Sequence, residues 1–210
     1  MPNGAGDSNP VTSRATSDPR VGVLALQGAF EAHQKRLSSI GVDAPLIRTP
    51  LELDAVDAVV MPGGESTTMS RLLTTSGLFD ALQGRFADGM PVFGTCAGMI
   101  LCSTEVLGGR PDQRSFGLID ITVRRNGYGR QLDSFESDIE VAGLAEPFHA
   151  VFIRAPLVER VGGDVEVLAS LDGVAVLARN RRCTVAAFHP ELTNDARLHE
   201  IFVSSLSTSH

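Results

Sequence analysis

Residues 91–100 read Pro91-Val92-Phe93-Gly94-Thr95-Cys96-Ala97-Gly98-Met99-Ile100. A short apolar strand leads into Gly-x-Cys-x-Gly, and an apolar run of helical character follows. This order is typical of a nucleophile elbow, with cysteine in place of the serine that many hydrolases carry. Gly94 and Gly98 flank Cys96 because a Cβ at either position would crowd the turn and the helix behind it. The N-terminus of that helix points at the sulfur and favours the thiolate.

Cys96 needs a partner base before it can be read as a nucleophile, because a buried structural cysteine also fits a strand end. Of the five histidines, His189 is the best candidate, since it alone follows a strongly apolar strand and has a carboxylate, Glu191, two residues further on. In an extended chain residues i and i+2 point to the same side, and Pro190 stiffens the link between them. Taken alone, this pair fits a surface His and Glu at a strand end equally well.

A second glycine-rich segment, Pro62-Gly63-Gly64-Glu65-Ser66, follows the apolar run at 57–61. Adjacent glycines at the carboxyl end of a strand let the backbone turn its N–H groups toward a ligand. The segment is suited either to an oxyanion hole or to a simple turn into the next helix, capped by Ser66 or Thr67. It lacks the Gly-Lys-Ser/Thr ending of a phosphate-binding loop.

Apolar runs alternate with amphipathic segments along the chain, which predicts an α/β fold with a largely parallel sheet and helices on its faces. An Asp172-Gly173 pair between two apolar runs predicts a hairpin. The predicted strands cover 21–26, 44–47, 57–61, 91–95, 119–123, 137–141, 150–153, 165–171, 174–178 and 182–188. The predicted helices cover 29–40, 51–55, 70–86 with a break at Ser76-Gly77, 97–102 and 195–206.

The 210-residue chain is long enough for one domain, which we expect at 21–210, after a disordered tail at 1–20 that has almost no apolar side chains. The net charge of −7 argues against nucleic-acid binding, and no apolar run is long enough to span a membrane. Three cysteines without close pairing indicate a reducing, cytoplasmic compartment. Cys102 and Cys183 lie in apolar runs and are expected to pack in the core.

The three motifs Pro62–Ser66, Gly94–Gly98 and His189–Glu191 together resemble those of class I, triad-type glutamine amidotransferases. The resemblance extends from about Val21 to the final helix and implies a flavodoxin-like, three-layer α/β/α fold with a central mixed, mostly parallel sheet. Further segments narrow it to the glutaminase subunits of pyridoxal 5′-phosphate synthase. These segments are Leu24–Gly28, Arg125–Gln131, Ser134–Glu136 and Ile153–Pro156. Gly127-Tyr128 departs mildly from the expected small residue and phenylalanine.

The resemblance implies hydrolysis of L-glutamine to glutamate and ammonia by a triad of Cys96, His189 and Glu191. Backbone N–H groups are expected to form the oxyanion hole; they belong to Gly63, Gly64 and Ala97. Glutamine is expected to bind at Gly64, Glu65, Ser66, Arg125, Ile153 and Arg154, with an arginine on its α-carboxylate. We expect no cofactor and no metal.

The ammonia is expected to pass to a TIM-barrel synthase subunit in a hetero-oligomer that makes pyridoxal phosphate. Gln27 is the candidate for sensing the docking of that partner, although a polar residue at a strand end needs no such role. The first helix, including His33, could lie at the same interface.

Three other functions stay open at this point. The chain could serve another biosynthetic pathway, such as imidazole glycerol phosphate synthase, but the Arg125–Gln131 segment argues against it. A cysteine hydrolase acting on peptides or aldehydes would share the elbow but not His189-Pro190-Glu191. An inactive partner-binding subunit would share the fold, and the intact Cys, His and Glu set argues against that.

Overall fold

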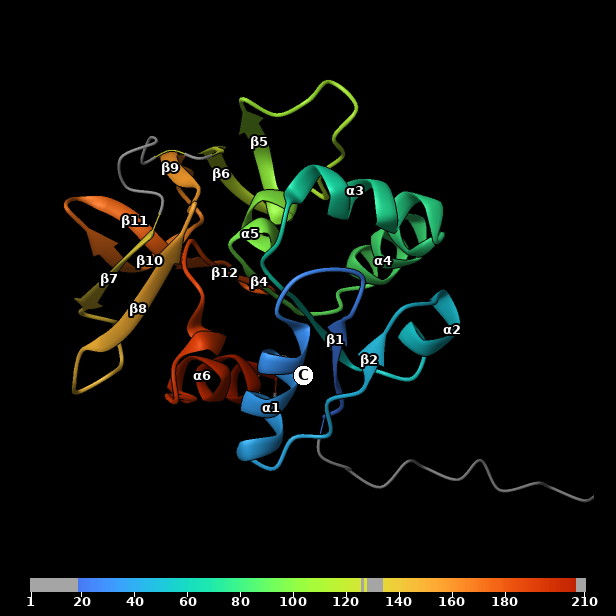
Figure 1. Ribbon diagram of the computed structural model, residues 1–210, viewed down its shortest axis with the longest axis horizontal. Helices are drawn as coiled ribbons and strands as arrows, with labels where there is room; N and C mark the ends of the chain where they lie inside the picture. The colour runs from blue at the N-terminus through green and yellow to red at the C-terminus, as the bar shows by residue number, and fades with distance from the viewer. Residues whose placement is uncertain (1–18, 126, 128–133, 207–210) are drawn as a thin grey trace, which may run out of the picture.

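The computed structural model describes residues 19–125, 127 and 134–206 of the chain (Figure 1). The predicted tail therefore lies almost wholly outside the described residues, as does most of the polar segment 124–131. Arg20, at the end of that tail, is held at the surface of the domain: its Nε donates to Asp43 at 2.6 Å and its guanidinium to the Ala55 carbonyl at 3.0 Å.

The described elements are short and alternate between strands and helices, as the apolar pattern predicts. In chain order they are β1 (Val21–Leu24), α1 (Phe30–Ser39), β2 (Leu46–Ile47), α2 (Pro50–Leu53), β3 (Ala58–Met61), α3 (Ser66–Thr75), α4 (Leu78–Ala87), β4 (Val92–Thr95), α5 (Ala97–Cys102), β5 (Ser103–Leu107), β6 (Ile119–Arg124), β7 (Ser134–Ile139), β8 (Phe148–Ile153), β9 (Leu157–Val161), β10 (Glu166–Leu171), β11 (Val174–Arg179), β12 (Cys183–Ala186), η1 (Pro190–Leu192) and α6 (Arg197–Leu206).

The central sheet has seven strands in the order β10-β11-β12-β4-β3-β1-β2. The five strands from β12 to β2 are parallel, whereas β10 and β11 add an antiparallel edge. Helices α1 and α6 lie side by side on one face, and α3, α4 and α5 lie on the other (Figure 1). This confirms the predicted three-layer α/β fold with a mixed, mostly parallel sheet.

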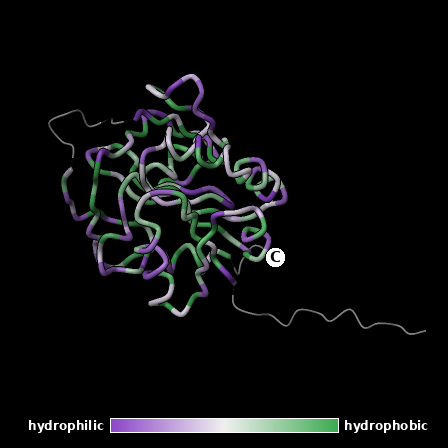
Figure 2. The backbone as a smooth tube through the Cα atoms, turned by 45° about the vertical axis from the view of Figure 1, so that its right-hand side comes forward, coloured by the Kyte–Doolittle hydropathy of each residue, from purple (hydrophilic) through white to green (hydrophobic). Residues whose placement is uncertain are grey.

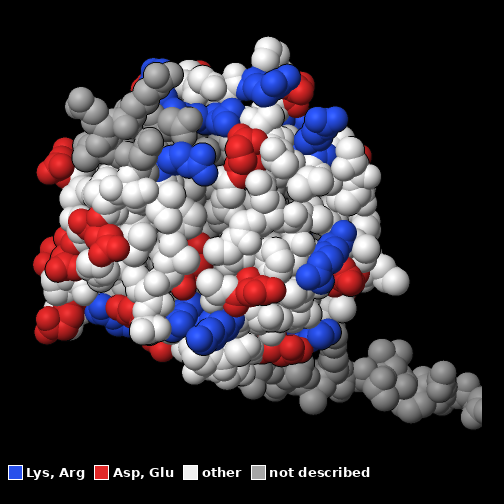
Figure 3. Space-filling view, viewed as in Figure 1, with Lys and Arg blue, Asp and Glu red and all other residues white. Residues whose placement is uncertain are grey.

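Four neighbouring strands of the sheet, β12, β4, β3 and β1, are buried at every residue. Their continuous apolar sequences follow from this, because a parallel sheet covered on both faces exposes neither side to water. Figure 2 shows that the hydrophobic residues gather in the middle of the molecule. Acidic and basic side chains are both present on the face seen in Figure 3. None of the described helices is long and apolar enough to cross a membrane.

Two small sheets beside the main one differ from the predicted elements. One contains β5, β6 and β9, and the other pairs β7 with β8. The sequence pattern missed β5 and β9 because polar residues interrupt their apolar ones and most positions are partly or fully exposed, so they lack a continuous or cleanly alternating apolar run. The predicted hairpin is confirmed: β10 pairs with β11, and Asp172 and Gly173 both have positive φ, 51° and 79°.

Candidate active site

The carboxyl ends of four parallel strands meet at one edge of the sheet. Strands β12, β4, β3 and β1 are adjacent, and each is followed by one of the segments singled out from the sequence. His189 follows β12, Cys96 follows β4, the Gly63-Gly64 pair follows β3, and Gln27 follows β1. Segments far apart in the chain therefore converge where open α/β sheets bind their ligands.

Cys96 occupies a strained turn, as the elbow pattern predicts. Its φ and ψ are 49° and −102°, and its N–H donates to the Ala186 carbonyl at 2.8 Å. The flanking glycines are required sterically. A Cβ at Gly94 would lie 2.7 Å from the Gly98 carbonyl group, and a Cβ at Gly98 would lie 2.1 Å from the Met61 carbonyl oxygen. The elbow is thus locked between β4 and its neighbours.

His189 and Glu191 face the same side of the chain, as predicted from their spacing. The Nδ1 atom of His189 lies 2.8 Å from Glu191 Oε1, and the His189 N–H donates to the Val151 carbonyl of β8 at 2.8 Å. A Cβ at Gly63 would lie 2.3 Å from His189 Cε1 and 3.2 Å from Cys96 Cβ. Gly63 therefore packs directly against both side chains.

The surroundings shift the pKa values of both His189 and Glu191. Burial lowers the pKa of His189, but its hydrogen bonds with Cys96 and Glu191 outweigh burial and raise the pKa to about 10. Burial raises the pKa of Glu191, but its electrostatic attraction to His33 and the hydrogen bond from His189 outweigh burial, so the pKa falls well below its usual range. The arrangement therefore suits a histidine that accepts the thiol proton and a carboxylate that stays ionised.

A buried group of polar side chains lies behind this pair and was not found from the sequence. His33 on α1 is fully buried, and its Nε2 lies 3.1 Å from Thr95 Oγ1 and 3.2 Å from Glu191 Oε2. Its Nδ1 lies 3.0 Å from Nε2 of His199 on α6, which is also fully buried. The His33 side chain faces the interior and so cannot itself contact a partner, whereas the expectation that α1 lies at the partner interface stays a prediction.

The burial of His199 predicts that the folded protein loses stability in acid. Burial lowers the pKa of His199 to about 3, and the charge of His33 adds to this effect, with Arg36 acting in the same direction and Glu191 and Asp195 opposing it. Between about pH 6.5, the usual value for an unfolded histidine, and pH 3, only the unfolded chain binds this proton, so the free energy of unfolding falls as the pH falls through that window.

Urea unfolding measured from pH 7 down to pH 4 checks this expectation against a His199→Gln variant, whose stability should fall less steeply with pH. His149→Gln is the matched control, because hydrogen bonds with Asp138 and Glu136 raise the pKa of His149 instead. Parallel pH slopes for wild type and His199→Gln would contradict the assignment.

Glu65 caps the N-terminus of α3, in place of the predicted Ser66 or Thr67. Its carboxylate accepts hydrogen bonds from the N–H groups of Thr67 at 3.1 Å and Thr68 at 2.7 Å. Burial raises the pKa of Glu65, but the hydrogen bonds with Thr68 and Thr67 outweigh it and lower the pKa to about 2. Shorter side chains dominate N-cap positions, so the sequence pattern does not indicate a glutamate there.

Arg125 joins Glu65 in a polar cluster beside α3. Its guanidinium donates to Glu65 Oε1 at 2.6 Å, to Thr67 Oγ1 at 2.8 Å and to Gln113 Oε1 at 3.2 Å. The Gln113 amide in turn donates to Ser66 Oγ at 3.2 Å. The structure thus brings three predicted glutamine-binding residues, Glu65, Ser66 and Arg125, into one hydrogen-bonded cluster, and it adds Gln113, which the sequence did not indicate. Glu65 and Arg125 also line a cavity of about 550 Å³, which neither Ser66 nor Cys96 lines.

The other predicted residues lie closer to Cys96. The Cys96 thiol lies 3.8 Å from the Ile153 carbonyl oxygen, at the end of β8, and donates to it. Arg154 follows with a positive φ of 44°. Ala97 is the first residue of α5, so its N–H has no acceptor within the helix. Gly64 contacts Gln27, since a Cβ at Gly64 would lie 3.3 Å from Gln27 Oε1.

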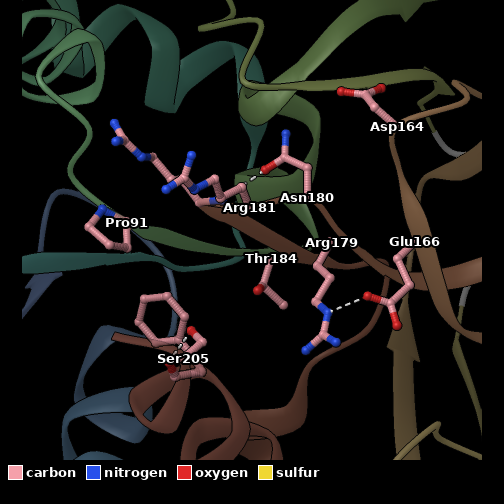
Figure 4. Close-up of a pocket in the computed structure, with 10 residues that line it drawn as sticks. Pro91, Asp164, Glu166, Arg179, Asn180, Arg181, Thr184 and Ser205 are labelled. Atoms are coloured by element: carbon pink, nitrogen blue, oxygen red, sulfur yellow. Dashed lines mark hydrogen bonds and ion pairs between the residues drawn. The ribbon is translucent and has the colours of Figure 1, made fainter. Parts of the chain in front are cut away.

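A separate cavity of about 390 Å³ opens at the other end of the sheet (Figure 4). Pro91, which precedes β4, and Thr184 of β12 line it, and Arg179 forms an ion pair with Glu166 at 2.7 Å. None of the predicted site residues lines this cavity. Among the residues that the structure describes, no group of three or more His, Cys, Asp or Glu side chains could hold a metal ion.

Comparison with solved structures defines the class to which this fold belongs. A crystal structure of a glutamine amidotransferase superposes with a TM-score of 0.84 at 45% sequence identity, covering 89% of this chain and 98% of that one. A glutamine amidotransferase from Thermotoga maritima shares the fold at a TM-score of 0.57 and 12% identity, with 91% and 85% covered. The chain is a glutamine amidotransferase.

Within that class, the chain belongs to the SNO glutamine amidotransferase family, which residues 23–208 match. It is 54% identical over 195 residues to the pyridoxal 5′-phosphate synthase subunit PdxT of Mycolicibacterium vanbaalenii, covering 91% of this chain and 100% of that relative. The subunit of the same name from Herpetosiphon aurantiacus is 54% identical over 186 residues, with 87% and 98% covered.

Proposed function

We propose that this chain is the glutaminase subunit of a pyridoxal 5′-phosphate synthase. It hydrolyses L-glutamine to L-glutamate and ammonia and delivers the ammonia to a synthase subunit. The observation that carries the proposal is the contact of Cys96, His189 and Glu191 beside Gly63, in a chain of the SNO family. The relatives that share more than half of its sequence are named as subunits of that synthase.

The proposed reaction is acyl transfer through Cys96. His189 accepts the thiol proton, and the thiolate attacks the side-chain carbonyl carbon of glutamine to form a tetrahedral intermediate. His189 then gives its proton to the leaving nitrogen, so ammonia departs and a thioester remains. Water, deprotonated by His189, attacks the thioester and releases glutamate. Glu191, 2.8 Å from His189 Nδ1, orients the ring and stabilises its cation in each step.

The N–H groups of Gly63, Gly64 and Ala97 are the proposed donors to the oxyanion of the intermediate. Gly64, Glu65 and Ser66 would bind glutamine from one side, and Ile153 and Arg154 from the other. Arg125 would bind the α-carboxylate. Since Glu65 already engages the Arg125 guanidinium at 2.6 Å, the substrate carboxylate would have to share that guanidinium with Glu65.

The partner is proposed to be a TIM-barrel synthase subunit in a hetero-oligomer, and Gln27 is the proposed reporter of its docking. Gln27 Oε1 is buried and accepts no hydrogen bond from the described residues, so its amide is free to take a new partner when the neighbouring loop rearranges. A cytoplasmic location is proposed because all three cysteines are unpaired. Membrane and nucleic acid are not among the proposed partners.

The test is ammonia release from glutamine by the purified chain, with and without the synthase subunit of a PdxT relative's complex. Hydrolysis is expected to rise sharply when that partner is added, and asparagine, one methylene shorter, is expected to react far more slowly. Docking is measured separately by analytical ultracentrifugation. A complex that forms without any hydrolysis would contradict the glutaminase and favour an inactive binding subunit instead.

A further inference from the structure

His33 connects two parts of the proposed active site that come from different strands. Its Nε2 lies 3.1 Å from the hydroxyl of Thr95, the residue that precedes Cys96, and 3.2 Å from Glu191 Oε2, the oxygen that does not bind His189. All three side chains are almost completely shielded from solvent. One ring nitrogen on α1 thus contacts both the end of β4 and the carboxylate of η1.

Hydrogen bonding assigns the proton positions in this group. His199 Nδ1 is buried and has no partner among the described residues, and a buried N–H without an acceptor is rarer than an acceptor without a donor. His199 therefore carries its proton on Nε2 and donates it to His33 Nδ1, 3.0 Å away. With Nδ1 accepting, the proton of His33 is on Nε2, where it faces Thr95 and Glu191.

The result is a network of donors that converges on Glu191 and Thr95, beside Cys96. His199 donates to His33, the Nε2–H of His33 is directed to Thr95 and Glu191, and His189 donates through Nδ1 to Glu191 Oε1. The aligned hydrogen bond of His33 Nε2 is with Thr95, whereas Glu191 Oε2 lies 3.2 Å from the same nitrogen and has no aligned hydrogen bond among the described residues. His33 therefore acts on the carboxylate through close contact and electrostatic attraction. Metal sites hold their ligating histidines with the same kind of outer hydrogen bond.

We propose that His33 is a positioning residue: its Nε2–H fixes the Glu191 carboxylate and the strand end that carries Cys96, so that sulfur and imidazole meet in reactive geometry. The proposal rests on the triad proposed above. His33 does not reach the substrate and acts only through Glu191 and Thr95. The titratable groups that face His33 are Glu191 from η1 and His199 from α6. Arg36 and Asp195 interact electrostatically with His199.

The test compares His33→Gln, whose amide nitrogen can take the place of Nε2, with His33→Leu, which keeps bulk but has no donor. We expect His33→Leu to lower kcat in the assembled complex by about 10- to 100-fold with little change in KM, and His33→Gln to keep most of the activity. His149→Gln, at an exposed histidine on β8, is the control that should leave kcat unchanged.

The second readout is the rate at which iodoacetamide alkylates Cys96 in the isolated chain, measured from pH 5 to 10 against a Cys96→Ala blank. In His33→Leu the rate should rise at higher pH than in wild type, because a misplaced Glu191 stabilises the imidazolium less. This assay needs no glutamine, so it separates the positioning role from the proposed function. If the wild-type chain hydrolyses no glutamine but the alkylation profile of His33→Leu is shifted, the proposed glutaminase function fails and the positioning role of His33 stands.

Wild-type kcat and an unshifted alkylation profile in His33→Leu would overturn the positioning role. An equal loss in the Gln and Leu variants, accompanied by an equal fall in unfolding temperature, would also overturn it, because packing alone would then account for the effect. If His33→Leu does not fold, His33→Asn replaces it, since its shorter amide reaches only the Nδ1 position. High activity in His33→Gln with low activity in His33→Asn would support the proposal.

Discussion

Replacement of Cys96 by alanine is expected to lower kcat for ammonia release by at least about 10⁴-fold, because the thioester cannot form without the thiol. Cys96→Ser should lose nearly as much. A hydroxyl is a far weaker acid than a thiol, so His189, although its pKa is raised to about 10, cannot produce the alkoxide as it can the thiolate.

Binding and folding should survive the loss of the thiol. Cys96 has a small buried side chain whose hydrogen bond to Ile153 is long, 3.8 Å, so the unfolding temperature and the complex with the synthase partner should change little. Steady-state kinetics on the complex measures the effect. Cys102→Ala is the matched control, because burial raises the pKa of the Cys102 thiol and keeps it unreactive. Comparable activity in Cys96→Ala and wild type would show that the nucleophile lies elsewhere.

The central sheet could be predicted because its sequence signal is local. Residues 21–24, 58–61, 92–95 and 183–186 are buried on both faces of a parallel sheet, so each is a continuous apolar run that needs no knowledge of its neighbours. The same reasoning could not find β5 and β9, whose half-exposed residues become strands only because β6 lies between them. Pairing partners, rather than intrinsic pattern, decide such strands.

The contact between His189 and Glu191 could be predicted for a similar reason. His189 and Glu191 are two residues apart, and Cys96 lies within its own glycine signature, so each motif is readable by itself. The buried polar contacts around His33 have no local signature, because His33 and His199 are 166 residues apart in the chain. The same holds for Gln113 and Ser66, which are 47 residues apart. A histidine on the apolar side of a predicted helix, four residues before Leu37, was the only available sign that His33 is buried.

Replacement of Gly28 by alanine is expected to lower activity because it displaces Gly63 and Gly64, which carry proposed oxyanion donors. Gly28 has a φ of +85°, and a Cβ there would lie 1.7 Å from the Gly63 carbonyl oxygen, so the Gly63-Gly64 peptide has to move. Since Gly63 packs against Cys96 and His189, a shift of about 1 Å would displace the proposed oxyanion donors. Misplacement of this size costs about 10²-fold in rate, so we expect kcat in the complex to fall at least that far.

Gly41→Ala separates this steric effect from backbone strain. Gly41 has nearly the same φ, +82°, but no atom lies within 4 Å of its Cβ position. Both variants carry the cost of a left-handed alanine, about 1–2 kcal/mol in the free energy of unfolding, whereas only Gly28→Ala disturbs Gly63. Urea unfolding should therefore give a loss of stability in Gly28→Ala at least as large as in Gly41→Ala, because the clash with Gly63 adds to the backbone strain. Kinetics should show a large loss of kcat in Gly28→Ala only. Equal activity in the two variants would mean that the loop accommodates the methyl group, and that Gly28 does not set the position of the oxyanion donors.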